Sequence, residues 1–143
     1  MTTGGRQRAA LARREMAVRR AEAYVRAHLD TLIPVSRLCR VVGLSERGLR
    51  NAFYEVRGMS PKRWILAERL SRTQMALCKP PDLALTVTAV AADHGFSQLG
   101  RFAGMYRKRF GETPSETLEA AWRDRGLLHQ RRSQGDGYAG TVR

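Results

Sequence analysis

The sequence contains two related segments, and this internal repeat constrains the fold more than any other feature. The first reads GLSERGLRNAFYEVRGMSP over residues 43–61, and the second reads GFSQLGRFAGMYRKRFGETP over residues 95–114. Both run Gly, apolar residue, Ser, a stretch that carries an aromatic residue, and a second Gly three residues before a Pro. Stacked repeat proteins need at least three copies, so two copies 52 residues apart predict two related small subdomains.

Each copy has the periodicity of an amphipathic helix. Apolar residues three and four positions apart fall on one helix face; they are Leu49, Ala52, Phe53 and Val56 in the first copy, and Phe102, Tyr106 and Phe110 in the second. A shorter periodic segment precedes each copy, at about 36–42 and 87–93. The pattern therefore predicts two pairs of helices.

The residues between the helices of each pair favour a tight turn. Gly43 and Gly95 follow the short segments, where a helix end often needs a left-handed residue. Ser45 and Ser97 can then cap the next helix. A helix, a turn with Gly and a capped helix form a helix-turn-helix unit, so we predict two such units, with recognition helices at about 46–56 and 98–109.

Three further helices are predicted, at about 16–30, 61–78 and 114–125. The second has Pro61 behind the cap candidate Ser60, and the third begins at a capping box, Thr113-Pro114-Ser115-Glu116. We therefore predict an all-α fold of about seven helices, with two helix-turn-helix subdomains over 15–60 and 79–126 and one long joining helix over 61–78. Residues 1–14 and 127–143 lack periodicity and are rich in Arg and Gly, so we predict mobile basic tails there.

Charge and length limit the class of protein. The 143 residues suffice for one domain or two small ones. The net charge of +13 indicates a polyanionic partner, which is nucleic acid or an anionic membrane surface. No run approaches the ~18 apolar residues of a membrane span, and the first residues do not form a signal peptide. Two cysteines make no disulfide framework. We expect a cytoplasmic protein and, of the two polyanions, nucleic acid as its partner, with no membrane partner.

With these features the sequence resembles the DNA-binding domain of the AraC family of bacterial transcription regulators, in which one long helix joins two helix-turn-helix units. The likeness covers about residues 16–122. It rests on VSRLCRVVGLSERGLRNAF, GMSPKRW and the pair Arg69-Leu70, and on VTAVAADHGFSQLGRFAGMYRKRFGETP in the second unit. The strings LGRF and PSETL are similar to a subgroup near the ethanolamine-utilisation regulators.

The resemblance implies a function. It implies a transcription regulator that binds double-stranded DNA sequence-specifically, associates with the nucleoid, and activates by contact with RNA polymerase. The joining helix, ~26 Å long at ~1.5 Å per residue, would hold the recognition helices near one DNA turn apart, ~34 Å. They would then enter adjacent major-groove segments of a non-palindromic site. Only about 15 residues precede the first predicted helix, so we expect the family's usual effector domain to be absent from this chain.

The outward faces of the two recognition helices supply candidates for base contacts. Arg47, Arg50 and Asn51 lie opposite the first apolar stripe, within the turns that reach base edges. Arg can grip guanine, and Asn can grip adenine, through two hydrogen bonds. Gln98 and Arg101 are the corresponding candidates in the second helix. The alternative interpretation is a solvated charged helix face.

A second group is expected to contact phosphates through hydroxyls, charges and helix-start amides. Its members are Ser36, Arg37, Lys62, Arg63, Thr86, Thr88 and Arg107.

The second unit also departs from the family pattern. It has Leu99, Gly100 and Gly104 where polar residues and an Arg are usual, and Thr117-Leu118 where Tyr-Arg is frequent. A groove-facing Gly lets the backbone approach phosphates closely, and a Gly that permits close helix packing is the alternative. These departures leave base reading by the second unit open.

No catalytic constellation is recognisable, so we expect no enzyme, no cofactor and no metal site. His28, His94, His129 and the two cysteines lack metal-ligand spacing. Cys39 and Cys78 have no activating neighbour, and packing is the expected role of both.

Three alternatives remain. One is a non-specific basic nucleic-acid-binding protein. Another is the DNA-binding module of an alkylation-repair methyltransferase, which would need a reactive Cys. The third is a protein-binding fragment that no longer reads DNA, which Gly100 and Gly104 suggest.

Overall fold

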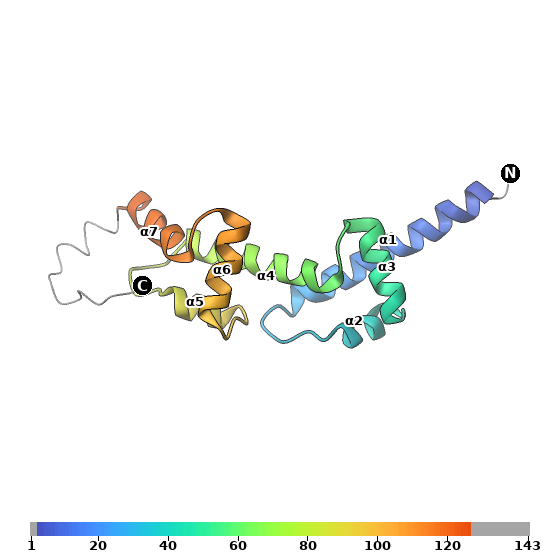
Figure 1. Cartoon of the computed structure of the whole chain (residues 1–143), viewed down its shortest axis with the longest axis horizontal. Helices are drawn as coiled ribbons and strands as arrows, with labels where there is room; N and C mark the ends of the chain where they lie inside the picture. Colours follow the sequence, from blue (N-terminus) through green and yellow to red (C-terminus); the bar gives the residue numbers. More distant parts are fainter. Residues whose placement is uncertain (1–2, 127–143) are drawn as a thin grey trace. The chain divides into compact units, whose positions relative to one another are not determined.

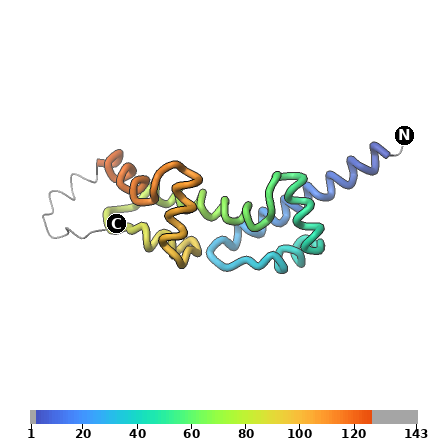
Figure 2. Tube along the Cα trace, in the orientation of Figure 1, coloured from blue at the N-terminus to red at the C-terminus, as the bar shows by residue number. Residues whose placement is uncertain are grey.

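The computed structural model describes residues 3–126, and within this range every regular element is a helix (Figures 1 and 2). The helices are α1 Thr3–Ala27, α2 Val35–Val42, α3 Glu46–Arg57, α4 Pro61–Cys78, α5 Val87–Asp93, α6 Leu99–Phe110 and α7 Pro114–Asp124. The predicted all-α fold of about seven helices is confirmed. The chain divides into two compact units between Arg69 and Leu70, so each unit contains part of α4.

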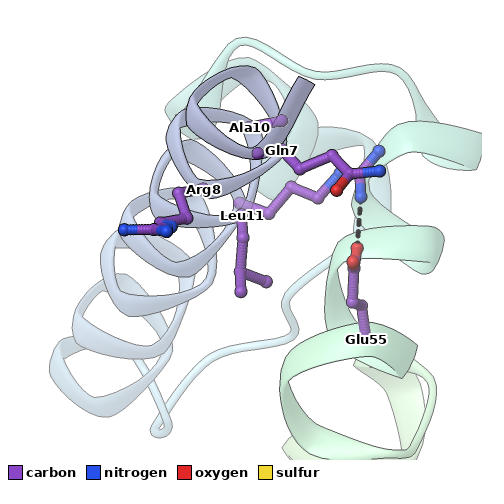
Figure 3. A pocket seen from close by; sticks show the side chains of 7 residues that line it. Gln7, Arg8, Ala10, Leu11 and Glu55 are labelled. Carbon is purple, nitrogen blue, oxygen red and sulfur yellow. Dashed lines mark hydrogen bonds and ion pairs between the residues drawn. The ribbon is translucent and has the colours of Figure 1, made fainter. Parts of the chain in front are cut away.

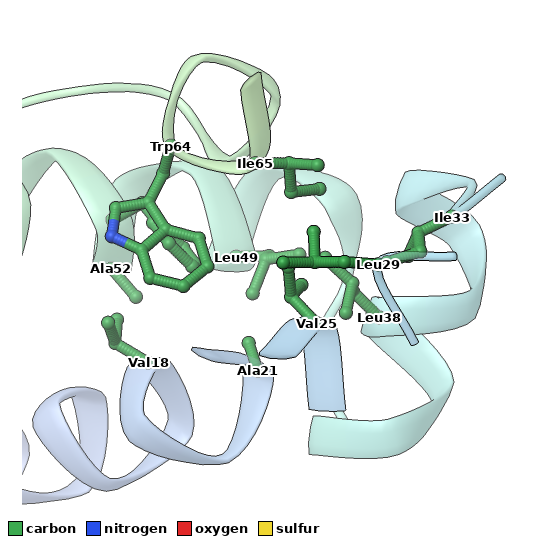
Figure 4. Close-up of a cluster of buried hydrophobic side chains, with 11 residues drawn as sticks. Val18, Ala21, Val25, Leu29, Ile33, Leu38, Leu49, Ala52, Trp64 and Ile65 are labelled. Carbon is green, nitrogen blue, oxygen red and sulfur yellow. The ribbon is translucent and has the colours of Figure 1, made fainter. Parts of the chain in front are cut away.

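The core of unit 1 is formed by α1, α2, α3 and the first half of α4. In Figure 4, Val18 and Ala21 of α1 face Trp64 and Ala52. Val18, Ala21 and Val25 form a buried apolar stripe along α1, and Leu29, just after the end of the helix, is buried as well. Burial of a large apolar side chain contributes about 1.5–3 kcal/mol, so this cluster fixes α3 against α1.

Unit 2 is organised around an aromatic row along α6. Ring centroids are 4.6 Å apart between Phe96 and Phe102, 5.7 Å between Phe102 and Tyr106, and 4.7 Å between Tyr106 and Phe110. The apolar face predicted for this helix is confirmed at Phe102 and Tyr106, which are at most 1% exposed. Trp122 of α7 is also buried.

Several predicted helix ends are confirmed. Gly43 ends α2 with φ of 72°, and the hydroxyl of Ser45 accepts a hydrogen bond from the Gly48 amide at 3.1 Å. Thr113 and Glu116 form the predicted capping box, with Pro114 at the first position of α7.

The turn of the second unit differs from the prediction. His94, not Gly95, caps the end of α5, and Gln98, not Ser97, precedes the first residue of α6. Gly95 still has a positive φ of 85°. The Phe96 amide bonds to the Ala91 carbonyl at 2.9 Å, and its ring packs on Phe102. These contacts hold the longer turn and move the helix start past Ser97.

The predicted unstructured segment over residues 1–14 is wrong for residues 3–14, which belong to α1. Residues 6–16 read RQRAALARREM, and all of these residue types have high helix propensity. Helix formation there does not depend on a buried stripe, which is why a search for apolar periodicity missed it. The helix also ends at Ala27, before the predicted residue 30. The tail predicted over 127–143 lies outside the described residues.

Among residues 3–126, no helix is both long enough and apolar enough to cross a bilayer.

Candidate nucleic-acid interface

One face of α3 is buried and the other is a continuous polar surface. Leu49, Ala52 and Phe53 are fully buried, so the periodicity of the helix turns their neighbours outward. The structure places the three predicted base-contact residues of this helix on the exposed side; they are Arg47, Arg50 and Asn51. Tyr54 lies one turn beyond Arg50 and is 53% exposed.

The sequence reasoning assigned no role to Tyr54. An exposed aromatic ring with a hydroxyl, one turn from Arg50 and two turns from Arg47, can donate to a phosphate or pack on a sugar. Its outward position at helical spacing from Arg47 and Arg50 was the signal that could have identified it.

A network of charges holds α3 against α1. Glu22 is 3% exposed, and its carboxylate accepts hydrogen bonds from Arg57 Nη2 at 2.7 Å and Nε at 3.2 Å. The hydrogen bond to Glu22 raises the pKa of Arg57. Arg26 Nη2 lies 3.9 Å from the same carboxylate, and its guanidinium lies 5.4 Å from the centre of the Trp64 ring. The recognition helix is thus fixed by a partly buried ion pair as well as by apolar contacts.

Arg69 fixes the loop that leads into the first helix-turn-helix. Its Nη1 donates to the Leu29 carbonyl at 2.8 Å, and its Nη2 donates to the Thr31 carbonyl at 2.6 Å. Burial lowers the pKa of Arg69, and the nearby Asp30 partly offsets this effect. Resemblance to a known family pointed to the Arg69-Leu70 pair, and the structure gives Arg69 a structural role.

The predicted phosphate-contact residues of unit 1 are all exposed. Ser36 and Arg37 occupy the first turn of α2, where Pro34 provides no side-chain cap. Lys62 and Arg63 occupy the first turn of α4, behind Ser60, whose hydroxyl accepts from the Arg63 amide at 3.3 Å.

In unit 2 the candidates lie on the exposed side of α6 and around α5. Gln98, Arg101 and Arg107 are exposed, and so are Thr86 and Thr88. The Thr86 hydroxyl accepts from the Ala89 amide at 3.1 Å. Its proton can still be donated to another acceptor.

The exposed face of α6 carries two glycines in open space. A Cβ atom added at Gly100 or Gly104 would meet no heavy atom within 4 Å. The interpretation that these glycines permit close packing between helices is therefore wrong for the described chain. Leu99, beside Gly100, is 41% exposed.

Thr117, at a position where the family often has Tyr, belongs to a series of hydrogen bonds between polar side chains. The Tyr106 hydroxyl donates to Thr117 Oγ1 at 2.7 Å, and Thr117 donates to Glu112 Oε1 at 2.7 Å. Burial raises the pKa of Tyr106, and its hydrogen bond to Thr117 only partly opposes this. The departure at Thr117 thus gives α6 a polar anchor on α7.

Neither cysteine has the surroundings of an activated nucleophile. Cys39 is half-buried, and burial raises the pKa of its thiol. Cys78 is exposed at the end of α4, so the packing role predicted for it is wrong. The apolar sequence around Cys78 gave no sign of its outward position.

Among the residues described, no group of three His, Cys, Asp or Glu could hold a metal ion.

Two helix-turn-helix units, each with a recognition helix that is apolar inside and basic outside, define a double helix-turn-helix domain. The family model of a helix-turn-helix domain matches residues 38–120. A probable AraC family transcriptional regulator from Rhodopseudomonas palustris has a crystal structure with a TM-score of 0.69 and 42% identity, covering 73% of this chain and 96% of that one. The chain belongs to the AraC family of helix-turn-helix proteins.

Two further relatives bear on function. The XylDLEGF operon transcriptional activator of Pseudomonas putida is 37% identical over 95 residues, which are 66% of this chain and 30% of that protein. The DNA-binding domain of AdpA, solved with a target DNA, has a TM-score of 0.63 and 27% identity, covering 80% of this chain and 95% of that one. The chain thus spans about 30% of the length of the first curated relatives it matches.

Proposed function

We propose that this chain is the DNA-reading part of a transcription activator and binds a non-palindromic site through α3 and α6. The observation that carries this proposal is the pair of exposed basic helix faces, each backed by a buried apolar stripe and preceded by a helix-turn-helix turn. Since α3 and α6 carry different outward residues, the two halves of the site differ in sequence.

In this proposal α3 does most of the base reading. Arg47 and Arg50 contact guanine, and Asn51 contacts adenine, through paired hydrogen bonds. Each such pair discriminates by about 1–3 kcal/mol against the wrong base. The fixed position of α3, set by Glu22 and Arg57, keeps these side chains in register.

The α6 helix contacts the DNA in a different way from α3. Gln98 and Arg101 contact bases near its start, and the open surface at Gly100 and Gly104 lets the helix backbone approach the DNA. Phosphate contacts orient both units; they come from Ser36, Arg37, Lys62, Arg63, Thr86, Thr88 and Arg107.

The biological setting follows from the same family. RNA polymerase is the proposed protein partner, and the bacterial nucleoid is the proposed location. We propose no enzymatic role, because nothing in the described residues activates Cys39 or Cys78 and the relatives are named as regulators.

The experiment that tests this function is selection of bound duplexes from a random pool, followed by competition. Unlabelled selected duplex should displace a labelled selected duplex at least 1000-fold more effectively than unlabelled random duplex, the low end of typical specificity ratios, ~10³–10⁷. Equal displacement by both competitors would instead establish a non-specific basic protein.

A further inference from the structure

The first half of α1 is a helical arm outside the core of unit 1. From Thr3 to Met16 no side chain is buried, and the first buried residue of the helix is Ala17. At ~1.5 Å per residue these positions extend the helix by about 20 Å. Figures 1 and 2 show this blue segment running beyond the other helices of its unit.

The arm is attached to the recognition helix. Arg14 forms an ion pair with Glu55 of α3, the residue next to Tyr54. Gln7, Leu11 and Glu55 help to line a groove of about 540 Å³ between the two helices (Figure 3). The arm thus runs beside α3, with this ion pair and this groove between the two helices.

The arm and the next helical turn of α1, residues 17–20, are strongly basic. Residues 3–20 contain six arginines and one glutamate, a formal charge of +5. Arg14 is paired with Glu55. The other five form no ion pair with any residue in the range 3–126; they are Arg6, Arg8, Arg13, Arg19 and Arg20. Concentrated charge of one sign repels itself, and an external polyanion would relieve that repulsion.

One side of the arm adjoins the turn before the recognition helix. Arg13 and Leu44 line a shallow groove of about 270 Å³, and Leu44 directly precedes Ser45, the cap of α3. Arg6 is seven residues before Arg13, close to two helical turns, and so shares this side. Arg8 points away from Glu55 in Figure 3, and Arg19, eleven residues later, falls on the same side as Arg8.

We propose that Arg6 and Arg13 form a sequence-independent phosphate-binding site for the DNA that flanks the half-site read by α3. The proposal rests on the DNA-binding function proposed above and extends its contact surface beyond the two helix-turn-helix units. Guanidinium groups suit phosphate recognition, because they remain charged and can bind two oxygens at once. Held on a helix, they act at a defined distance from the α3 turn.

The test compares two double variants that remove the same charge from opposite sides of the arm. Arg6→Gln/Arg13→Gln removes the proposed site, and Arg8→Gln/Arg19→Gln is the matched control. All four side chains are exposed, so far-UV circular dichroism should show folded protein in both cases. Binding is measured by fluorescence anisotropy over a range of salt concentrations. One duplex ends at the selected motif, and a second extends about one helical turn, ~10 bp, on each side.

The proposal predicts a difference confined to the longer duplex. There Arg6→Gln/Arg13→Gln should lower the slope of log K against log salt by about 2, since each phosphate contact contributes ~0.9, and should weaken binding roughly tenfold at ~0.15 M salt. The control should stay near the wild-type slope. On the short duplex all three proteins should bind alike.

Two results would overturn the proposed site. If both double variants match the wild type on the longer duplex, the arm does not contact flanking DNA. If both lose affinity equally, the arm contributes only diffuse charge and no binding face. Failure of the proposed function is separate from either, because it appears as a wild-type protein that does not prefer the selected motif over random duplex.

Discussion

Arg57, the last residue of α3, donates two hydrogen bonds to the buried carboxylate of Glu22 in α1. This pair holds the C-terminal end of the recognition helix α3 against α1. Removal of the arginine would leave Glu22 with only Arg26, whose guanidinium is 3.9 Å away. A buried carboxylate that loses its partner is strongly destabilising.

We therefore expect Arg57→Ala to lower the free energy of unfolding by about 2–3 kcal/mol, less than for a fully buried pair because Arg57 is 42% exposed. Arg14→Ala breaks the exposed pair with Glu55 and serves as the control, with an expected loss below about 1 kcal/mol. Urea unfolding of each variant checks both values. Equal losses would show that the burial of Glu22 has no energetic consequence.

Gly104 gives a prediction in which stability and DNA affinity change in opposite directions. Because a Cβ there meets open space, Gly104→Ala should raise the free energy of unfolding by about 1 kcal/mol through helix propensity. The same methyl group should weaken binding to the selected duplex if the α6 backbone approaches the DNA. Thermal unfolding and anisotropy measure the two effects, and a stabilised variant with unchanged affinity would contradict the close approach.

Tyr106 should make stability depend on alkaline pH. Burial raises its pKa, so the unfolded chain loses this proton at a lower pH than the folded chain. The contribution of Tyr106 to the free energy of unfolding is therefore complete below the ordinary tyrosine pKa of about 10. It declines as the pH rises above that value.

Tyr106→Phe isolates this contribution. Near neutral pH the variant should be about 1 kcal/mol less stable, because the hydrogen bond to Thr117 is lost. The difference from the wild type should shrink between pH 8 and about pH 11, in urea unfolding at each pH, as the native tyrosine becomes unfavourable. A constant difference would show that Tyr106 ionises alike in both states.

The cysteines should differ in reactivity as their exposure differs. Iodoacetamide should label Cys78, which is exposed, and spare Cys39, whose pKa is raised by burial. Mass spectrometry of the native protein, with Cys78→Ser as the control, gives the site of modification. Rapid labelling of Cys39 would revive the methyltransferase interpretation.

Much of the fold could be predicted because local signals agree with the tertiary packing. The buried stripe of Val18, Ala21 and Val25 and the capping box at Thr113 have short-range causes, and the structure contains both. The exposed candidates for DNA contact follow from the same periodicity, since residues opposite a buried stripe point outward.

Other features depend on contacts distant in sequence. The burial of Glu22 could not be predicted from the sequence, because it depends on contact with Arg57, which is 35 residues away in the chain. The start of α6 depends on the packing of Phe96 against Phe102. The arm of α1 has high helix propensity but few apolar residues, so a search for apolar periodicity could not find it.

The central claim, that α3 and α6 read different halves of one site, is tested most directly by repeating the random-pool selection with Arg50→Ala and Arg101→Ala. Each variant should relax base preference at a separate position of the motif, by about 1–3 kcal/mol per lost bidentate contact. Arg123→Ala, an exposed change in α7, should leave the motif intact. If Arg50→Ala selects the wild-type motif unchanged, α3 does not read the DNA as proposed.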